Sequence, residues 1–167
     1  MRFGRIFFIL VILFCAVAMA RLWRIMPEQM AAHFNIQGNP DRFVPKIQFF
    51  LTQIRIMLVV FLVSLPIQAL FLVVPPNIVN MPNREYWLAP ERRAKTMERI
   101  GDFGSTMFAI ILSTIQAAFE ISAYANLHTP IVFNARLMGL VLVISSGAIL
   151  LMLIGLILSF RLPSSAD

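Results

Sequence analysis

The chain has 167 residues with a net charge of +6, and 59% of its residues are hydrophobic against 13% charged. Its mean hydropathy of +0.82 lies well outside the range of soluble domains and predicts an integral membrane protein. A single cysteine, Cys15, excludes a disulfide framework or a cysteine-based metal site within one chain.

Four apolar runs predict an all-α integral membrane protein, with four transmembrane helices in one membrane domain, residues 1–167. The first, about residues 6–23, is short for a hydrocarbon core of about 30 Å. Its basic start and its Ala18-Met19-Ala20 pattern also fit a cleaved signal peptide, but we expect a retained helix. The other three spans are expected at about residues 55–74, 103–124 and 137–160.

The distribution of positive charge predicts the orientation in the membrane. With four spans, both termini lie on the same side as the loop 75–102. That side carries eight Lys and Arg residues, namely Arg2, Arg5, Arg84, Arg92, Arg93, Lys95, Arg99 and Arg161. The other side carries six, namely Arg21, Arg24, Arg42, Lys46, Arg55 and Arg136. The positive-inside rule therefore places both termini in the cytoplasm, and this clustering at span ends argues against a nucleic-acid partner.

The cytoplasmic loop 75–102 is predicted to contain a short amphipathic helix leading into the third span. Pro90 suits the first helical position and Glu91 the first turn. The helix carries four basic residues, Arg92, Arg93, Lys95 and Arg99. It is interpreted either as a solvated helix that orients the protein or as a contact site for anionic lipid or a cytoplasmic protein.

The third span is the only one that contains an acid. Small residues recur along it every four positions, at Ser105, Ala109, Ser113 and Ala117, and Gln116 and Glu120 project from nearly the same side. A carboxylate at this depth is costly, so Glu120 should face the bundle or water. One interpretation is that Glu120 pairs with Arg55, or with Arg136, His33 or His128, or reaches outer water. The other is that Gln116 and Glu120 line a ligand, ion or proton site.

No catalytic constellation can be assembled. His33 and His128 share the outer side with Glu28 and Glu120, which are zinc-ligand types, but no short metal-binding pattern is present. There is no hydrolase elbow, phosphate loop or dinucleotide fingerprint. We therefore predict no catalytic residue, no metal site and no cofactor, and we expect a binding protein rather than an enzyme.

The outer loop 26–46, "MPEQMAAHFNIQGNPDRFVPK", has the turn residues of a compact folded segment. Gly38, Asn39 and Pro40 favour tight turns, and Phe34 and Phe43 supply apolar anchors. Because this loop is polar and faces outward, we select four of its residues as candidate ligand contacts, His33, Asn35, Gly38 and Asp41.

This loop resembles a known pattern: Met26-Pro27, His33-Phe34-Asn35, Gly38-Asn39-Pro40-Asp41 and Lys46. The pattern is similar to the bacterial domain of unknown function DUF1648, found at the N-terminus of SdpI-type immunity proteins. The segment "NREYWLAPERRAKTMERI" also resembles the cytoplasmic loop of stand-alone members. The chain departs from the family at Ala31, often proline, and at Phe43, often tryptophan. The full immunity proteins are longer, with further membrane helices.

The resemblance implies a bacterial inner-membrane protein with a retained first helix. Its outer loop and Glu120 face would receive an extracellular peptide, toxin or small ligand, and its basic helix would contact a cytoplasmic partner. The alternative is a transport-related or assembly subunit, acting as a homo-oligomer through small residues on its helix faces. An outward-facing metal-dependent enzyme is the third interpretation.

Overall fold

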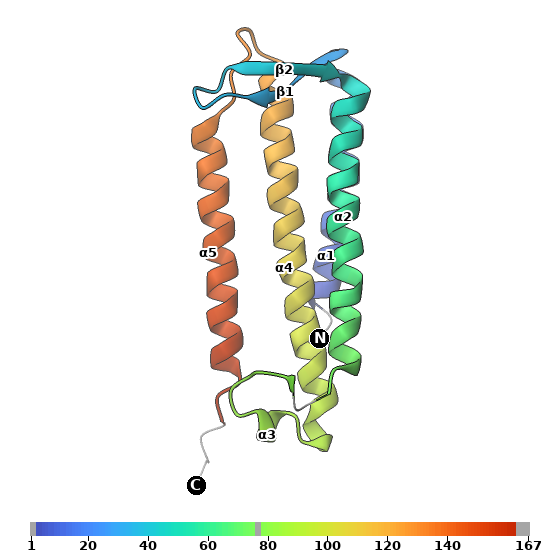
Figure 1. The fold of residues 1–167 in the computed structure, drawn as a ribbon, viewed down its shortest axis with the longest axis vertical. Helices are drawn as coiled ribbons and strands as arrows, with labels where there is room; N and C mark the ends of the chain where they lie inside the picture. Colours follow the sequence, from blue (N-terminus) through green and yellow to red (C-terminus); the bar gives the residue numbers. More distant parts are fainter. Residues whose placement is uncertain (1–2, 76–77, 163–167) are drawn as a thin grey trace.

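The computed structural model describes residues 3–75 and 78–162, without the side chains of residues 67–73. Within these residues four long helices run side by side: α1 (Phe3–Ile25), α2 (Lys46–Val73), α4 (Pro90–Ala125) and α5 (Ala135–Ser159) (Figure 1). A short helix, α3 (Arg84–Trp87), lies at one end of the bundle, the α3 end. An antiparallel hairpin of β1 (Gln29–Phe34) and β2 (Pro40–Pro45) lies at the other, the hairpin end.

All four long helices are long and apolar enough to cross a membrane. The predicted fold class, a multi-pass helical membrane protein, is confirmed. The helices extend beyond the predicted apolar spans, most clearly in α2, which begins at Lys46. Residues 76 and 77 of the predicted loop 75–102 lie outside the described residues.

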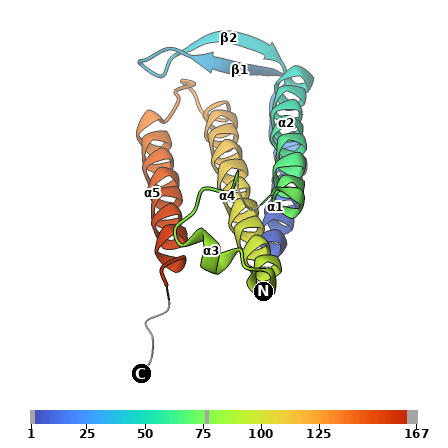
Figure 2. The same ribbon diagram turned by 60° about the horizontal axis from the view of Figure 1, so that its bottom comes forward.

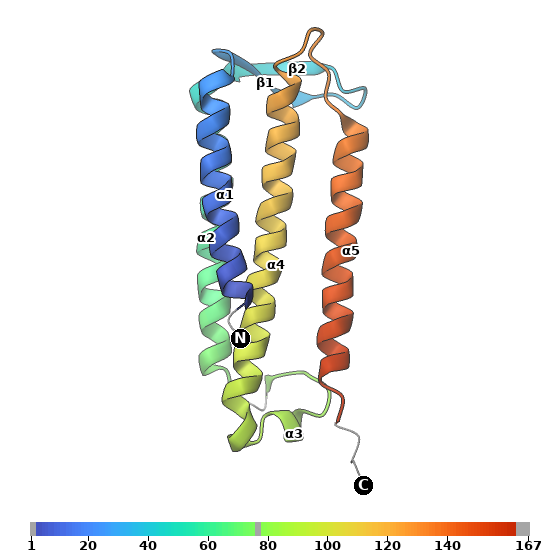
Figure 3. The same ribbon diagram turned by 180° about the vertical axis from the view of Figure 1, so that it is seen from behind.

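Helix α4 is the central element of the bundle. Helices α1 and α2 pack on one side of it and α5 stands on the other (Figures 1 and 3). Two apolar clusters hold α1 against α4. One contains Phe8, Cys15 and Leu112, and the other joins Leu22 and Phe119 near the hairpin. By contrast, α5 contributes no buried residue.

The start of α1 is anchored on α4. Asp102 Oδ1 accepts hydrogen bonds from the backbone N–H groups of Gly4, at 2.8 Å, and Arg5, at 3.4 Å. The first N–H groups of a helix have no acceptor within the helix itself, and a carboxylate that accepts from them is stabilising. A Cβ at position 4 would collide with the carbonyl oxygen of Asp102, so glycine permits this close approach.

The predicted amphipathic helix is not a separate element. It forms the first turns of α4, whose 36 residues reach about 54 Å at about 1.5 Å per residue, well beyond a bilayer core of about 30 Å. The surplus length carries the basic segment out of the apolar layer at the α3 end.

The predicted small face of the third span is only partly the packed face. Ser105 and Ala109 are buried, but Ser113 is exposed. Large side chains, among them Phe108 and Leu112, occupy the contact with α1 and α2 instead. The strict four-residue repeat drifts around a helix of 3.6 residues per turn, so its later members rotate away from the contact.

The outer loop forms a β-hairpin rather than an irregular loop. Its strands "QMAAHF" and "PDRFVP" lack the alternating β-branched pattern that indicates a strand from sequence. The hairpin lies across the helix ends, running from α2 toward the α5 side (Figure 2). It therefore caps the bundle at this end.

Candidate functional site

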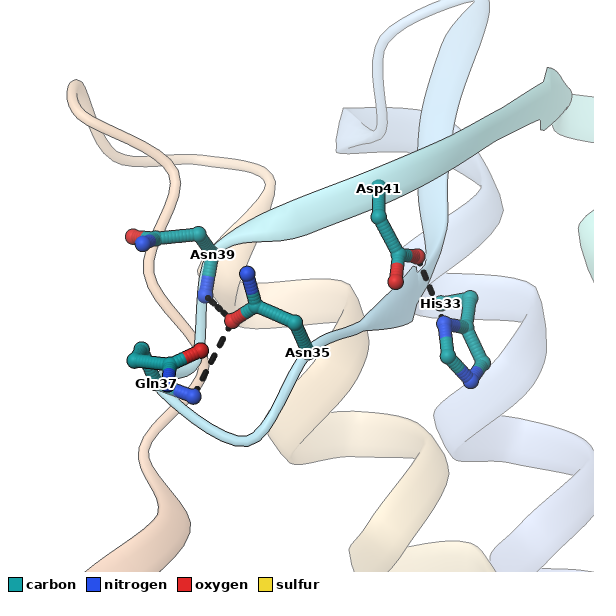
Figure 4. Close-up of polar contacts among 5 residues, drawn as sticks. All are labelled: His33, Asn35, Gln37, Asn39 and Asp41. Atoms are coloured by element: carbon teal, nitrogen blue, oxygen red, sulfur yellow. Dashed lines mark hydrogen bonds and ion pairs between the residues drawn. The ribbon is translucent and has the colours of Figure 1, made fainter.

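His33 and Asp41 face each other across the hairpin. Nδ1 of His33 lies 2.5 Å from Oδ1 of Asp41 (Figure 4). Both side chains are substantially exposed, at 62% and 42%. The pair contributes little to stability in this setting because water competes for both groups. These two candidate residues are paired with each other.

Asn35 organises the hairpin turn. Its side-chain Oδ1 accepts hydrogen bonds from the backbone N–H groups of Gln37 and Asn39, each at 3.0 Å (Figure 4). Its own backbone N–H donates to the carbonyl of Asn39 at 2.9 Å. Asparagine is favoured in such turns because its short amide can bond to the following backbone. The contacts of Asn35 are therefore those of a turn-forming residue.

Gly38 joins the hairpin tip to the loop between α4 and α5. Its φ of 83° lies in the left-handed region that favours glycine, and its carbonyl accepts a hydrogen bond from the N–H of Phe133 at 2.8 Å. The rings of Phe34 and Phe133 pack with centroids 5.2 Å apart. The hairpin tip thus holds the α4–α5 loop in place.

Asn126, at the C-cap of α4, was not selected from the sequence, yet it fixes the hairpin to the bundle. The N–H of Ala31 donates to Oδ1 of Asn126 at 2.6 Å, and Nδ2 of Asn126 donates to the carbonyl of Ala31 at 3.1 Å. The side-chain amide of Asn126 thus pairs with the backbone of Ala31 as a residue of a neighbouring strand would. A lone asparagine after a helix is typical of a cap, so the sequence carries no signal for this long-range contact.

Lys46 ties the base of the hairpin at the start of α2. Its Nζ donates to the carbonyl of Met26 at 3.1 Å, lies 3.4 Å from Oε1 of Glu28, and sits 4.8 Å from the ring centroid of Trp23. The residues of the loop pattern are therefore engaged mainly with one another and with the bundle.

A groove of about 530 Å³ lies between α4 and α5 at the hairpin end, beside the hairpin tip. Glu120, Tyr124 and His128 line it from α4 and the turn after it, while Asn134 and Leu137 line it from the start of α5. Val132, next to Phe133, forms part of its rim. Most of the lining is apolar, so Glu120 is a carboxylate set in a largely apolar groove.

Gln116 lies one turn below Glu120 and is almost completely buried, with 1% exposure. Its Nε2 donates to Oε1 of Glu120 at 3.0 Å, while its own Oε1 has no partner among the described residues. One turn above, the hydroxyl of Tyr124 accepts a hydrogen bond from Arg21 of α1. The structure therefore brings Gln116, Glu120 and Tyr124 into one polar stripe along α4.

The predicted ion pair between Glu120 and Arg55 is wrong. Among the described residues the ion pairs within 4 Å are His33–Asp41 and Lys46–Glu28. Helix α2 turns the side chain of Gln53 toward the bundle and leaves Arg55 exposed. Of the other predicted partners, His128 shares the groove with Glu120, whereas His33 is paired with Asp41.

The acids and histidines considered for zinc do not converge. Among the described residues no group of three or more His, Cys, Asp or Glu side chains could hold a metal ion. His33 and Glu28 lie on the hairpin, engaged with Asp41 and Lys46, while Glu120 and His128 lie in the groove.

The four basic residues selected in the predicted amphipathic helix divide between two sides of α4. Arg93 donates to the carbonyl of Val74 at 2.8 Å, beside the end of α2. The other three, Arg92, Lys95 and Arg99, line a second cavity with α3 and the end of α5. The first helix turns of α4 thus place three of the four cations together.

Residues 10–57 match the family model described as a domain of unknown function, DUF1648. The match confirms the resemblance for this segment, which holds most of α1, the hairpin and the first part of α2. The groove residues of α4 and α5 lie beyond the matched segment. No curated protein and no solved structure matches the chain.

Proposed function

We propose that the protein is a ligand-binding membrane protein whose α4–α5 groove receives an extracytoplasmic peptide or small amphipathic ligand. The observation that supports this most strongly is the groove of about 530 Å³ at the hairpin end with Glu120 in its wall. Its volume falls within the range of about 300–1,000 Å³ that is typical of small-ligand sites.

The lining favours one kind of ligand. Apolar side chains such as Ile121, Leu137 and Val141 suit an apolar body, and the carboxylate of Glu120 suits an ammonium or guanidinium group. The hydroxyl of Tyr124 and the ring of His128 add polar contacts. The preferred ligand is therefore an amphipathic cation.

In this proposal the hairpin shapes the groove rather than forming the ligand contact itself. Gly38 and Phe34 hold Phe133, and the neighbours of Phe133 along the chain, Val132 and Asn134, line the groove. His33, Asn35, Gly38 and Asp41, the predicted ligand contacts of the hairpin, then act through this loop. Displacement of the tip would widen or close the groove.

Binding is tested with dansylcadaverine, which joins an apolar aromatic body to a primary ammonium. In purified protein, Glu120→Gln should weaken binding by about tenfold or more, the usual value of a charge-assisted hydrogen bond. Glu28→Gln is the matched control, because it removes the same charge from an exposed site at the same end. Equal affinities for the two variants would refute the groove as the binding site.

The proposal also requires the hairpin end to face outward, with both termini in the cytoplasm of a bacterial inner membrane. Single cysteines at Asn39 and at Ala94, in a Cys15→Ser background, test this in intact cells. Both sites are exposed. Labelling by an impermeant reagent at residue 39 alone supports the proposal, and labelling at residue 94 alone would invert the orientation.

An SdpI-like immunity role is the physiological form of this proposal, in which the ligand is a toxin peptide and a cytoplasmic protein contacts the basic segment. The family match supports the domain but extends over residues 10–57 alone. Cells carrying the Glu120→Gln protein should lose tolerance to the toxin at unchanged protein level. Retained tolerance would exclude the role for this groove.

An oligomeric transport-related or assembly subunit is the second candidate, favoured by one observation. Helix α5 is apolar and contributes no buried residue to the described chain, so its surface is free to meet lipid or a second copy. A single cysteine at Gly147, where nothing lies within 4 Å of an added Cβ, should form disulfide-linked dimers in membranes if copies meet there. Monomer alone would count against this candidate.

A further inference from the structure

A second cavity, of about 670 Å³, lies at the α3 end, and we call it the α3-end pocket. It is lined by Tyr86 and Trp87 from α3, by the first turns of α4 and by Phe160 after α5. Two of its residues mark its position along the bundle. Asp102 accepts a hydrogen bond from the first turn of α1, and Phe160 directly follows the apolar helix α5. The pocket therefore lies at the edge of the apolar layer, where aromatic side chains meet lipid headgroups.

Three cations enter this pocket with their donors largely unused. The guanidinium of Arg92 lies 4.1 Å from the ring centroid of Tyr86, and that of Arg99 lies 5.6 Å from that of Phe160. Their hydrogen bonds to backbone carbonyls are long, at 3.4 Å each. Lys95 has no hydrogen-bond or ion-pair partner among the described residues. Rings thus position the guanidinium groups of Arg92 and Arg99 without neutralising them.

Three acids line the same pocket, but they are not equivalent. Asp102 is engaged by the N-terminus of α1. Glu91 and Glu98 form no ion pair within 4 Å in the described parts of the chain, although cations lie on the same helix face. The pocket thus offers separated positive and negative groups, an arrangement that suits a ligand with both charges.

We propose that the α3-end pocket binds the headgroup of a zwitterionic phospholipid. The phosphate contacts Arg92, Lys95 and Arg99, and the headgroup ammonium contacts Glu91 and Glu98. The acyl chains then lie along the apolar surfaces of α4 and α5 that begin at the pocket. This site is at the opposite end of the bundle from the Glu120 groove, so it is independent of the proposed function.

The test is lipid retention by purified protein, incubated with equal amounts of phosphatidylethanolamine and phosphatidylglycerol and measured by native mass spectrometry. Lys95→Gln should lower phosphatidylethanolamine retention about fivefold, the effect of one basic residue at a lipid surface, and Lys95→Arg should restore it. Arg93→Gln is the matched control, since it removes the same charge from the neighbouring helix face and should retain wild-type lipid.

Two further arms separate the headgroup from other ligands. Removing both acids, in Glu91→Gln with Glu98→Gln, should shift the preference toward phosphatidylglycerol, since the ammonium loses its contacts. Inorganic phosphate should leave lipid retention unchanged. Equal retention by Lys95→Gln and Arg93→Gln would overturn the proposal. So would preferential retention of phosphatidylglycerol by the wild type, or displacement of lipid by millimolar phosphate, which would mark a soluble phosphate as the ligand.

Discussion

The hairpin and the α4–α5 groove lie side by side at one end of the molecule, but their polar groups are used differently. In the hairpin, Asn35, Asp41 and Lys46 are bound to other groups of the chain. In the groove, Gln116 of the same helix is the one hydrogen-bond partner of Glu120 among the described residues, and the Glu120 carboxylate lines an open cavity. The comparison teaches that the polar groups of the most recognisable motif are engaged in contacts within the chain, whereas the carboxylate of our proposed binding site lies outside that motif.

The largest expected effect tests how firmly the hairpin is fixed. Asn126→Ala leaves the backbone N–H and carbonyl of Ala31 buried without partners, since Ala31 has 0% exposure. We expect a loss of about 3 kcal/mol in the free energy of unfolding, because each orphaned buried group costs about 1–3 kcal/mol. Reversible unfolding in mixed micelles measures it. Asn39→Ala is the control, since its exposed side chain makes no hydrogen bond or ion pair in the described chain and should change stability little.

Gly38→Ala tests whether the hairpin tip determines the shape of the groove. An alanine there must adopt a φ of 83°, and its Cβ would lie 2.9 Å from the carbonyl oxygen of Phe133. We expect a cost of about 2 kcal/mol from the left-handed backbone and the crowded contact. Dansylcadaverine affinity should fall as well, because Val132 and Asn134 move with Phe133. A destabilised protein with wild-type affinity would show that the hairpin tip does not shape the groove.

Asp102→Ala gives a smaller effect at the other end of the bundle. It removes the acceptor of the Gly4 and Arg5 backbone donors, which should cost about 1 kcal/mol, as loss of a helix cap does. Amide exchange in the first turn of α1 should rise, with the hairpin amides unaffected. The control is Glu98→Ala, one turn earlier on α4, which should leave exchange unchanged both in the first turn of α1 and in the hairpin. If Asp102→Ala increased exchange in the hairpin, the two ends of the bundle would not be independent.

The smallest effect is expected at His33 of the hairpin. His33→Gln removes an exposed pair with Asp41 and should change stability by less than about 0.5 kcal/mol. Both stability and probe affinity should stay close to wild type. A large loss of affinity without a loss of stability would make His33 a ligand contact and reverse the comparison between hairpin and groove.

Part of the fold could be predicted from local sequence and part could not. The four spans follow from apolar runs, and the turn residues Asn35 and Gly38 mark the hairpin tip, because both signals are local. The strands were missed because neither carries the alternating pattern of a half-buried strand. The amphipathic helix was predicted as an element distinct from the third span, but no residue between Pro90 and Phe103 breaks the helix, and the two form the single helix α4.

Long-range partners account for the remaining failures. The helical period predicts that Gln116 and Glu120 project from the same side of α4, where they are hydrogen-bonded. The rotation of α2 about its axis, which exposes Arg55 and buries Gln53, depends on packing that one sequence does not reveal. Asn126 and Ala31 lie 95 positions apart. The family pattern often has proline at the position of Ala31, and proline could not donate the N–H that Asn126 receives. This contact is therefore a property of this chain that the motif does not predict.

Hydrogen–deuterium exchange of the backbone with and without dansylcadaverine tests the central claim most directly. If the hairpin is a folding element and the groove is the binding site, the hydrogen-bonded amides of Ala31, Gly38 and Phe133 are protected before the probe is added. The probe should then increase protection around Tyr124 and Leu137, beside the groove. Rapid exchange of the hairpin amides until the probe is added would contradict the account, because the hairpin would then be ordered by the ligand and would itself be the receptor.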